Sequence, residues 1–318
     1  MKPQDSKPPH SSAQTQESSA PPQENESANA SLENLATNLE QLSIEKEKKI
    51  PFSHEQLKDI IADLERDIAN GKWFEGSHYY ADTDLKMMPA LIDQANHKHQ
   101  GLNLKFITTS EDLVSSIKEA VESGIQSSRY IVNTTDRGIH SAVLDHRTIE
   151  GKTSLILFEP ATFTDEAPLL LGVRIYLTIQ EKLPECSFSK VEMDIQRSPS
   201  ECSIISLALA KKLHTEADKL TRLHGDNIAS VLCKTNLTLP SDKLDPYLPP
   251  SFHKHTQGRR RLQKYSETNP EAENTKVNKK GETLRERFEK NLVTIEGKTV
   301  SVSLHKKRVT EYKSVLKL

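Results

Sequence analysis

Apolar residues recur at helical spacing shortly after position 50. Five of them fall at intervals of three, one, three and four residues: Leu57, Ile60, Ile61, Leu64 and Ile68. One face of an α-helix collects residues at such intervals, so the pattern predicts an amphipathic helix. Ser53 and Gln56 have the spacing of an N-terminal capping box, and Gly71 is placed to end the helix.

Helical and strand-like patterns then follow one another along the chain. Helical periods predict helices near residues 87–97, 111–122 and 169–182, and short apolar runs predict strands at 102–107, 129–133 and 188–195. Two more apolar runs, separated by a polar stretch ending in Glu150-Gly151, predict a hairpin of 138–145 and 152–159. This mixture indicates an α/β (α+β) fold, in which a mixed sheet is layered with helices in a broadly papain-like core.

A single cysteine stands where a loop meets a predicted helix. The loop 194–202 leads from a strand into the apolar segment 203–213, so Cys202 lies at a helix N-terminus. Unpaired N–H groups and the helix dipole favour a thiolate there, which makes Cys202 a candidate nucleophile. The amide of Gln196, six residues upstream, is placed to donate to an oxyanion. A buried cysteine without a catalytic role is the alternative.

The hairpin supplies a candidate base and acid for this cysteine. If its turn is centred between Ile149 and Glu150, His140 faces Glu159 across the two strands. Opposed residues share a sheet face with Cβ atoms about 4.5 to 5.5 Å apart, so the carboxylate can fix the imidazole tautomer and stabilise its charged form. Asp145 is a rival acid but falls on the opposite face. A histidine satisfied by hydrogen bonds inside the sheet is the alternative for His140.

The order histidine, acid, glutamine, cysteine is that of the ubiquitin-like-protein proteases, whereas in papain the cysteine comes first. Several stretches around these positions resemble the YopJ/AvrA family of bacterial type III secreted acetyltransferases. The resemblance covers about residues 53–318 and rests on GIH at 138–140, KTSLILFEP at 152–160, VEMDIQRSPSEC at 191–202, LALAKKL at 207–213, LDPYLP at 244–249 and KHTQG at 254–258. Pro199 before the cysteine and Ser203 after it are small departures from the family pattern.

The resemblance implies a protein serine/threonine O-acetyltransferase that uses Cys202, His140 and Glu159, with Gln196 at the oxyanion. Acetyl-CoA would acetylate the cysteine, and the acetyl group would pass to Ser or Thr hydroxyls of host MAP kinase kinases and related kinases, blocking their phosphorylation. The implied acetyl-CoA contacts are His140, Arg197, Ser198, Lys212, Leu213, His214, Thr215 and Glu296. Taken without the resemblance, Lys212 is equally a solvated helix residue and Glu296 an exposed turn residue.

Composition indicates one sizeable domain behind a polar leader. The chain has 318 residues, a net charge of −2 and 35% hydrophobic residues. The three cysteines, Cys186, Cys202 and Cys233, show neither metal-ligand spacing nor a disulfide framework, so we expect no metal and no disulfide. The sequence shows no Sec-type signal peptide and no run of apolar residues long enough to span a membrane.

Residues 1–50 contain no aromatic residue, no valine and no arginine. Such a segment cannot bury enough apolar surface to offset its conformational entropy, so we expect a disordered, solubilising tail. The resemblance implies a secretion signal and a chaperone-binding stretch in this leader, and secretion by a type III system into the host cell cytoplasm. The predicted organisation is a leader at 1–50, a catalytic core at 51–250 and a basic regulatory region at 251–318 that packs on the core.

The C-terminal region is the basic part of the chain. Residues 251–318 hold 17 Lys and Arg against 8 Asp and Glu. Nucleic acid is a poor partner because aromatic residues are sparse and not interleaved with the charges, and a membrane-binding amphipathic helix is not evident. A solvated face remains the ordinary interpretation of any single cluster. A compact polyphosphate fits better, and the resemblance implies that inositol hexakisphosphate binds as an activator at Lys254, His255, Thr256, Gln257 and Arg287.

Two other classes of function stay open on the sequence. A cysteine protease that cleaves ubiquitin or ubiquitin-like conjugates has the same triad, since a thiolate attacks an isopeptide carbonyl as well as a thioester. The basic C-terminal region favours acetyl transfer, because a protease of this architecture does not need it. A binding module without catalysis is the third class, and it predicts that Cys202→Ala changes nothing.

Overall fold

A mixed β-sheet forms the centre of the protein. The computed structural model describes residues 50–72, 77–134, 140–233, 238–295 and 298–317. Six strands lie in chain order across the sheet: β1 (Leu104–Ile107), β2 (Ser127–Val132), β3 (Ala142–Ile149), β4 (Lys152–Glu159), β5 (Ser187–Glu192) and β6 (Thr238–Leu239). β2, β3 and β4 are antiparallel, and the pairs β1–β2, β4–β5 and β5–β6 are parallel. The predicted mixed sheet is confirmed.

The β3–β4 hairpin is present, but its predicted register is wrong by two residues. Ile149 pairs with Lys152, so the turn consists of Glu150 and Gly151. Both turn residues have positive φ, 50° and 75°, a conformation that suits a two-residue hairpin loop. Because side chains alternate with a period of two, a shift of two residues keeps every side chain on its predicted face.

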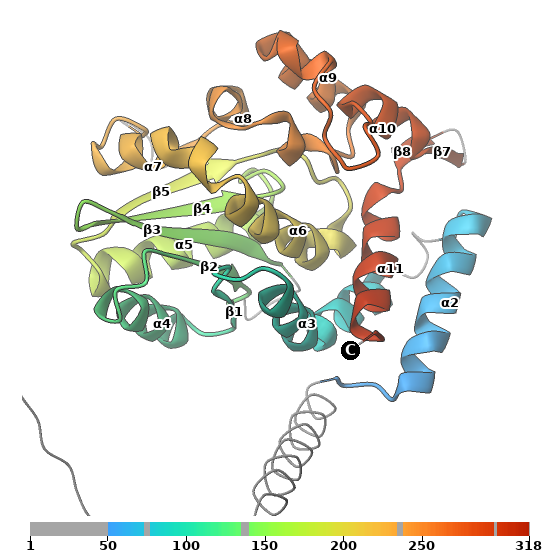
Figure 1. The fold of residues 1–318 in the computed structure, drawn as a ribbon, viewed down its shortest axis with the longest axis horizontal. Helices are drawn as coiled ribbons and strands as arrows, with labels where there is room; N and C mark the ends of the chain where they lie inside the picture. Colours follow the sequence, from blue (N-terminus) through green and yellow to red (C-terminus); the bar gives the residue numbers. More distant parts are fainter. Residues whose placement is uncertain (1–49, 73–76, 135–139, 234–237, 296–297, 318) are drawn as a thin grey trace, which may run out of the picture. The chain divides into compact units, whose positions relative to one another are not determined.

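Helices cover both faces of the sheet (Figure 1). One face carries α3 (Ser77–Lys98), α6 (Cys202–Thr215) and α7 (Thr221–Ile228), and the other carries α4 (Ser110–Glu122) and α5 (Glu166–Lys182). Alternate strand residues serve the two layers: Val143 joins the apolar cluster of α6, and Leu144 joins that of α5. The sheet is therefore buried on both faces, which explains why each central strand contains consecutive apolar residues, at 130–132, 142–144 and 155–158.

The N-terminal helices agree with the sequence pattern in different degrees. α2 (His54–Asn70) has the predicted capping box of Ser53 and Gln56, and Gly71 caps its end with φ 73°. α3 is longer than predicted because it begins at Ser77 and continues through Pro89. The predicted helix at 87–97 has Pro89 in its first turn, where proline is tolerated, whereas in the observed helix Pro89 is internal.

The C-terminal region folds against this core and adds short elements. These are α9 (Arg259–Thr268), α10 (Leu284–Lys290), the hairpin of β7 (Leu292–Ile295) and β8 (Lys298–Ser301), α11 (Ser303–Val315) and the 3₁₀ turn η5 (Pro270–Glu273). The core itself also contains α8 (Ser241–Leu244) and the 3₁₀ turns η1 (Pro199–Glu201), η2 (Ala217–Leu220) and η3 (Asp245–Tyr247), and η4 (Pro250–His253) joins it to the C-terminal region. α11 packs against α2, α3 and α6 (Figure 1). The last helix of the chain therefore lies beside the helix that begins with Cys202.

Candidate active site

Three side chains from separate parts of the chain meet at the N-terminus of α6. Cys202 is the first residue of this helix, Glu159 is the last residue of β4, and His140 lies two residues before the start of β3. The Nε2 atom of His140 lies 2.8 Å from Oε2 of Glu159, and the side chains of His140 and Cys202 share a hydrogen bond. All three are buried. The structure thus brings together the cysteine, histidine and glutamate that the sequence singled out.

The electrostatics of this cluster favour a charged imidazole. Burial by itself lowers the pKa of His140, but hydrogen bonds with Cys202 and Glu159 and the negative charge of Glu159 outweigh it, so the pKa rises to about 10. Glu159 uses Oε2 for His140, while its Oε1 accepts a hydrogen bond of 2.8 Å from the backbone N–H of Ala161. Fixed at both oxygens, the carboxylate holds the Nε2–H tautomer and leaves Nδ1 for the sulfur.

The rival acid, Asp145, has other partners. It accepts hydrogen bonds from Nε of Arg129 at 2.9 Å and from Nε2 of His224 at 3.0 Å, and it is fully buried. These contacts lie on the α6 face of the sheet and involve neither His140 nor Cys202. The sequence-based preference for Glu159 over Asp145 agrees with this geometry.

The loop before Cys202 is held by its own polar contacts. Nε2 of Gln196 donates to the backbone carbonyl of Ser198 at 2.6 Å, and Oε1 of Gln196 is buried without a hydrogen-bond partner. Ser198 in turn caps the 3₁₀ turn η1, because its hydroxyl accepts from the backbone N–H of Ser200. The glutamine amide therefore lies in the loop that leads to the sulfur and still has a second N–H to offer.

Gln257 fastens this loop from the C-terminal region. Its Oε1 accepts from the backbone N–H groups of Arg197 at 2.5 Å and Ser198 at 3.0 Å, and its Nε2 donates to the carboxylate of Glu201. Its own N–H donates to the carbonyl of Ile195 at 2.9 Å. The sequence analysis placed Gln257 among phosphate ligands, whereas the structure gives its side chain contacts to the loop.

Two residues of α11 also hold this loop, and the sequence analysis missed both. Arg308 donates to the carbonyl of Ser200 at 2.7 Å and forms paired bonds of 2.9 and 2.8 Å with Asp84 of α3. Nε2 of His305 lies 3.0 Å from Oε1 of Glu201. Both belong to the basic run at 305–308, which on sequence alone is indistinguishable from a solvated face. Their burial distinguishes them from solvated basic residues, and it is visible only in the structure.

A cluster of cationic side chains gathers where α10 and α11 approach the segment 254–257. Arg287 donates through Nε to the carbonyl of Lys254 at 2.9 Å, and both Arg287 and His255 bond the hydroxyl of Ser303. Burial, together with the charges of Lys307, Lys212 and Arg287, lowers the pKa of Lys254 to about 7. The charges repel one another, so an anion of high charge would relieve the repulsion.

Two buried polar atoms beside this cluster have no hydrogen-bond partner: Nε2 of His255 and Oγ1 of Thr256. Burial lowers the pKa of His255 well below its ordinary value, and the nearby cations act in the same direction. Unsatisfied buried polar groups are rare in folded proteins and are typical of ligand sites. Four of the predicted inositol phosphate ligands therefore lie together: Lys254 and Arg287 supply the positive charge, and His255 and Thr256 supply the unsatisfied polar atoms.

Comparison with known proteins identifies the family. A family model described as YopJ Serine/Threonine acetyltransferase matches residues 57–314. This chain belongs to that family. The YopJ proteins of Yersinia pestis and Yersinia pseudotuberculosis are each 51% identical to it over 275 residues, which are 86% of this chain and 95% of the relative. The resemblance of the sequence motifs to the YopJ/AvrA family is confirmed, and the chain is a serine/threonine acetyltransferase.

Solved structures agree with this assignment. A deletion variant of AvrA with inositol hexakisphosphate and CoA superposes with a TM-score of 0.80 at 51% identity, over 84% of this chain and 100% of that one. HopZ1a in complex with the same two molecules superposes with a TM-score of 0.65 at 19% identity, over 82% of this chain and 98% of that one. At that identity HopZ1a supports the fold alone.

The predicted acetyl-CoA contacts of this YopJ-family chain fall into two groups. Arg197 and Ser198 lie beside the N-terminal end of α6 with His140, and Lys212 to Thr215 form its last turn. The 14 residues of α6 separate these ends by about 20 Å. Glu296 lies outside the described residues. One ligand reaching both groups must be elongated and lie along α6.

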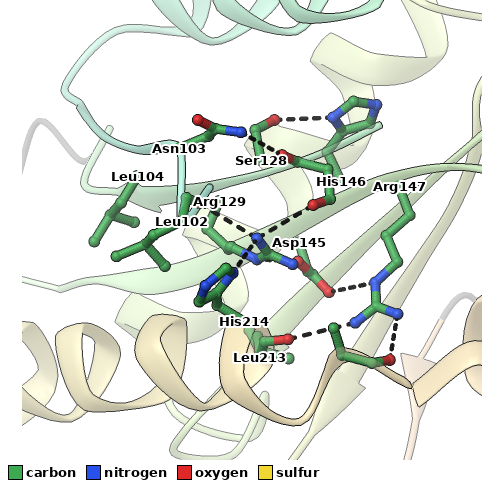
Figure 2. A network of polar contacts seen from close by, with 12 residues as sticks. Leu102, Asn103, Leu104, Ser128, Arg129, Asp145, His146, Arg147, Leu213 and His214 are labelled. Carbon is green, nitrogen blue, oxygen red and sulfur yellow. Dashed lines mark hydrogen bonds and ion pairs between the residues drawn. The ribbon is translucent and has the colours of Figure 1, made fainter. Parts of the chain in front are cut away.

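A buried polar network anchors the far end of α6 (Figure 2). Arg147 donates to the carbonyl of Leu213 at 3.4 Å and to that of Ala217 at 2.6 Å, and NH1 of Arg129 lies 3.4 Å from Nδ1 of His214. Carbonyl groups at a helix C-terminus lack intrahelical partners and carry partial negative charge, so a guanidinium stabilises them. The network therefore fixes the turn that carries Lys212 and His214.

Other classes of site receive no support in the described ranges. Within them, no group of three or more His, Cys, Asp and Glu side chains is arranged to hold a metal ion. No helix of that part of the chain has the length and apolar character to cross a membrane.

Proposed function

We propose that this acetyltransferase uses Cys202, His140 and Glu159 to form an acetyl-cysteine from acetyl-CoA and then acetylates Ser and Thr hydroxyls of host MAP kinase kinases and related kinases. The observation that carries the proposal is the buried hydrogen-bonded chain from Glu159 through His140 to Cys202. Nucleophile, base and orienting acid are the parts that covalent acyl transfer requires.

Each residue has a defined part in the first half-reaction. His140 takes the thiol proton, and the thiolate of Cys202 attacks the thioester carbonyl. Gln196 and backbone N–H groups near Cys202 donate to the oxyanion that forms. When the carbon–sulfur bond of the thioester breaks, His140 returns the proton to the CoA sulfur. Glu159 keeps the ring oriented and stabilises its charged form throughout.

In the second half-reaction, a kinase hydroxyl replaces the thiol of CoA. His140 removes the hydroxyl proton, the oxygen attacks the acetyl carbon, and Cys202 is released as the thiolate and takes its proton back. An acetylated Ser or Thr has no hydroxyl to accept phosphate. Acetylation in a kinase's activation segment would therefore stop its activation.

Inositol hexakisphosphate is the proposed activator, with Lys254, His255, Thr256, Gln257 and Arg287 as its ligands. The mutual repulsion of Lys254, Lys307, Lys212 and Arg287 and the unsatisfied atoms of His255 and Thr256 fit a compact polyanion. Gln257 and the α11 residues connect this region to the loop before Cys202, so ordering the cluster would steady the nucleophile. In this proposal residues 251–318 regulate the core at 51–250.

The test incubates the purified protein with labelled acetyl-CoA and a MAP kinase kinase, with and without inositol hexakisphosphate. Mass spectrometry should find acetyl on Cys202 and on Ser or Thr of the kinase, at a much higher rate with the polyphosphate. Cys202→Ala should abolish both modifications, and Cys186→Ala, a change at another buried cysteine, should leave them intact. Cleavage of ubiquitin-like conjugates without acetyl transfer would establish the protease alternative, and equal rates without the polyphosphate would remove the activator.

The route to the substrate is part of the proposal. We propose that residues 1–50 carry a type III secretion signal and a chaperone-binding stretch, and that the protein works in the host cell cytoplasm. Residues 1–49 lie outside the described part of the chain. Deleting the leader should block translocation while leaving acetylation by the purified protein unchanged, which a translocation assay and the acetylation assay measure separately.

A further inference from the structure

The outward face of α5 is apolar. Leu169, Leu170, Val173 and Leu177 are exposed by 44, 52, 41 and 58%, and three of them recur every four residues, which aligns them along one side of the helix. Across the described residues eight large apolar side chains are exposed, and half of them belong to this one helix. Scattered exposed apolar residues need no explanation, but a contiguous stripe marks an interaction site.

The core does not account for this stripe. Leu171, Ile175 and Ile179 form the inward face of α5 and are fully buried against the sheet and α4. A helix that covers one face of a sheet is expected to be polar on its outer side. α5 is apolar on both sides, and its outer side has no partner within the described chain.

α4 extends the apolar stripe toward its neighbour. Glu111 at the start of α4 is close enough to Lys182 at the end of α5 to raise the pKa of that lysine, after the larger effect of Glu181. α4 packs beside α5, and Val121, the second-last residue of α4, is 41% exposed. We call the set Leu169, Leu170, Val173, Leu177 and Val121 the α4–α5 apolar surface.

The charges around this surface are mostly negative. α4 and α5 carry two exposed lysines, Lys118 and Lys182, against six exposed carboxylates, Glu111, Asp112, Glu119, Glu122, Glu166 and Glu181. A second copy of the chain would bring two such faces of like charge together, which is unfavourable. A partner with aliphatic side chains between Lys or Arg residues would match both the apolar stripe and its acidic border.

The surface begins near the catalytic end of the sheet. Glu166, the first residue of α5, follows Glu159 by seven positions, so the two lie within about 25 Å of each other at full extension. A protein bound along α5 can therefore present a neighbouring segment to Cys202. Binding at such a second site raises the effective concentration of the acceptor hydroxyl at the acetyl-cysteine.

We propose that the α4–α5 apolar surface is the docking site for the protein substrate, and that it binds a substrate segment in which aliphatic residues are flanked by Lys or Arg. This inference rests on the proposed function, because it assumes a protein acceptor. Docking contributes to the second half-reaction only. Acetylation of Cys202 by acetyl-CoA does not involve this surface.

The test compares Leu170→Lys/Leu177→Lys with Val231→Lys/Val300→Lys, which places the same charges on exposed valines elsewhere. Acetyl-Cys202 formation and acetyl transfer to an intact MAP kinase kinase are measured separately, with acetyl-CoA and inositol hexakisphosphate present. The α5 variant should lose about tenfold or more in kcat/KM for the kinase, the effect of losing about 1.4 kcal/mol of binding. It should keep the wild-type rate of acetyl-Cys202 formation, and the valine variant should match wild type in both steps.

A charge variant tests the nature of the partner. Glu122→Lys/Glu166→Lys reverses two carboxylates of the border and should raise KM for the kinase. It should also weaken the rise of KM with salt that wild type shows. Unchanged kinase acetylation in both the leucine and the glutamate variants would overturn the proposal.

Three further outcomes also decide against it. If wild type is a dimer in sedimentation equilibrium and Leu170→Lys/Leu177→Lys dissociates it, the surface binds a second copy of the chain instead. Equal losses of acetyl-Cys202 formation and kinase acetylation in the α5 variant would show a defect of folding or catalysis and not of docking. A wild-type protein that acetylates Cys202 but no kinase would refute the proposed acceptor, and so separates failure of the function from failure of the surface.

Discussion

Replacing Glu159 by glutamine is the sharpest test of the proposed triad. The side chain keeps its size, but its negative charge beside His140 disappears. A carboxylate at hydrogen-bonding distance moves the pKa of its partner by about 1 to 3 pH units. Each unit corresponds to about 1.4 kcal/mol, so the charged imidazole loses about 1.4 to 4 kcal/mol relative to the neutral ring. The thiolate–imidazolium pair becomes about tenfold to a thousandfold less favourable.

The hydrogen bonds of Glu159 add a second effect. One carboxylate oxygen accepts from the N–H of Ala161, and the glutamine oxygen will keep this bond because only oxygen can accept it. The amide NH₂ must then donate to Nε2 of His140, which moves the ring proton to Nδ1, the nitrogen facing Cys202. A base that already carries its proton cannot take another. The equivalent amide replacement in a serine-protease triad costs about 10⁴ in kcat.

We therefore expect Glu159→Gln to slow acetyl-Cys202 formation by at least about 10³. The assay follows the acetylated protein by intact mass spectrometry in single turnover with excess acetyl-CoA. Glu192→Gln is the matched control, because Glu192 pairs with Glu159 in register on β5 and bonds the N–H of Phe163. The control should react at the wild-type rate. A Glu159→Gln protein that folds and acetylates at that rate would refute the triad.

Three further changes have expected outcomes of their own. Arg147→Met removes the N–H groups that donate to the carbonyls at the end of α6. It should raise KM for acetyl-CoA about tenfold and leave the maximal rate of acetyl-Cys202 formation unchanged. A fall in the maximal rate with an unchanged KM would contradict this expectation. Lys254, with its pKa lowered to about 7, is charged below that pH and neutral above it. Because the polyphosphate favours the charged form, calorimetry should show that binding takes up protons above pH 7 and that affinity for the polyphosphate falls as pH rises. Lys254→Arg should abolish both effects. Gly172→Ala places a Cβ 2.7 Å from the ring of Phe163 and should cost about 1 to 3 kcal/mol in urea unfolding. The control Gly225→Ala meets no atom within 4 Å and should stabilise the protein by about 0.4 to 1 kcal/mol; equal effects would exclude overpacking.

The sequence predicted the neighbours of Cys202 because the relevant signals are local. A face of a strand is decided by whether a position is odd or even, so His140 and Glu159 were assigned to one face although the register was wrong by two residues. The true register is fixed by positive φ at both Glu150 and Gly151. Glutamate has no preference for positive φ, so the sequence does not mark Glu150 as a turn residue. The error was therefore in the turn, and the conclusion about the face was unaffected.

The contacts that hold the loop before Cys202 could not be predicted from the sequence, because they join residues that are far apart in the chain. Arg308 pairs with Asp84 across 224 positions, and Gln257 bonds Ser198 across 59. Neither residue belongs to a periodic pattern that indicates its partner, and the run around Arg308 is as basic as any solvated surface. Burial of a guanidinium with a carboxylate depends on how α3 and α11 pack. Sequence periodicity predicts faces of elements but not which faces meet.

The bond from Arg308 to the carbonyl of Ser200 joins positions 108 residues apart. A ribosome releases Cys202 into solution well before α11 has been made. During that interval the loop before Cys202 lacks its bond to the guanidinium of Arg308, so the thiol of the nascent chain does not yet have the surroundings of the folded protein. The loop before Cys202 therefore gains this bond only after α11 has been synthesised and has docked.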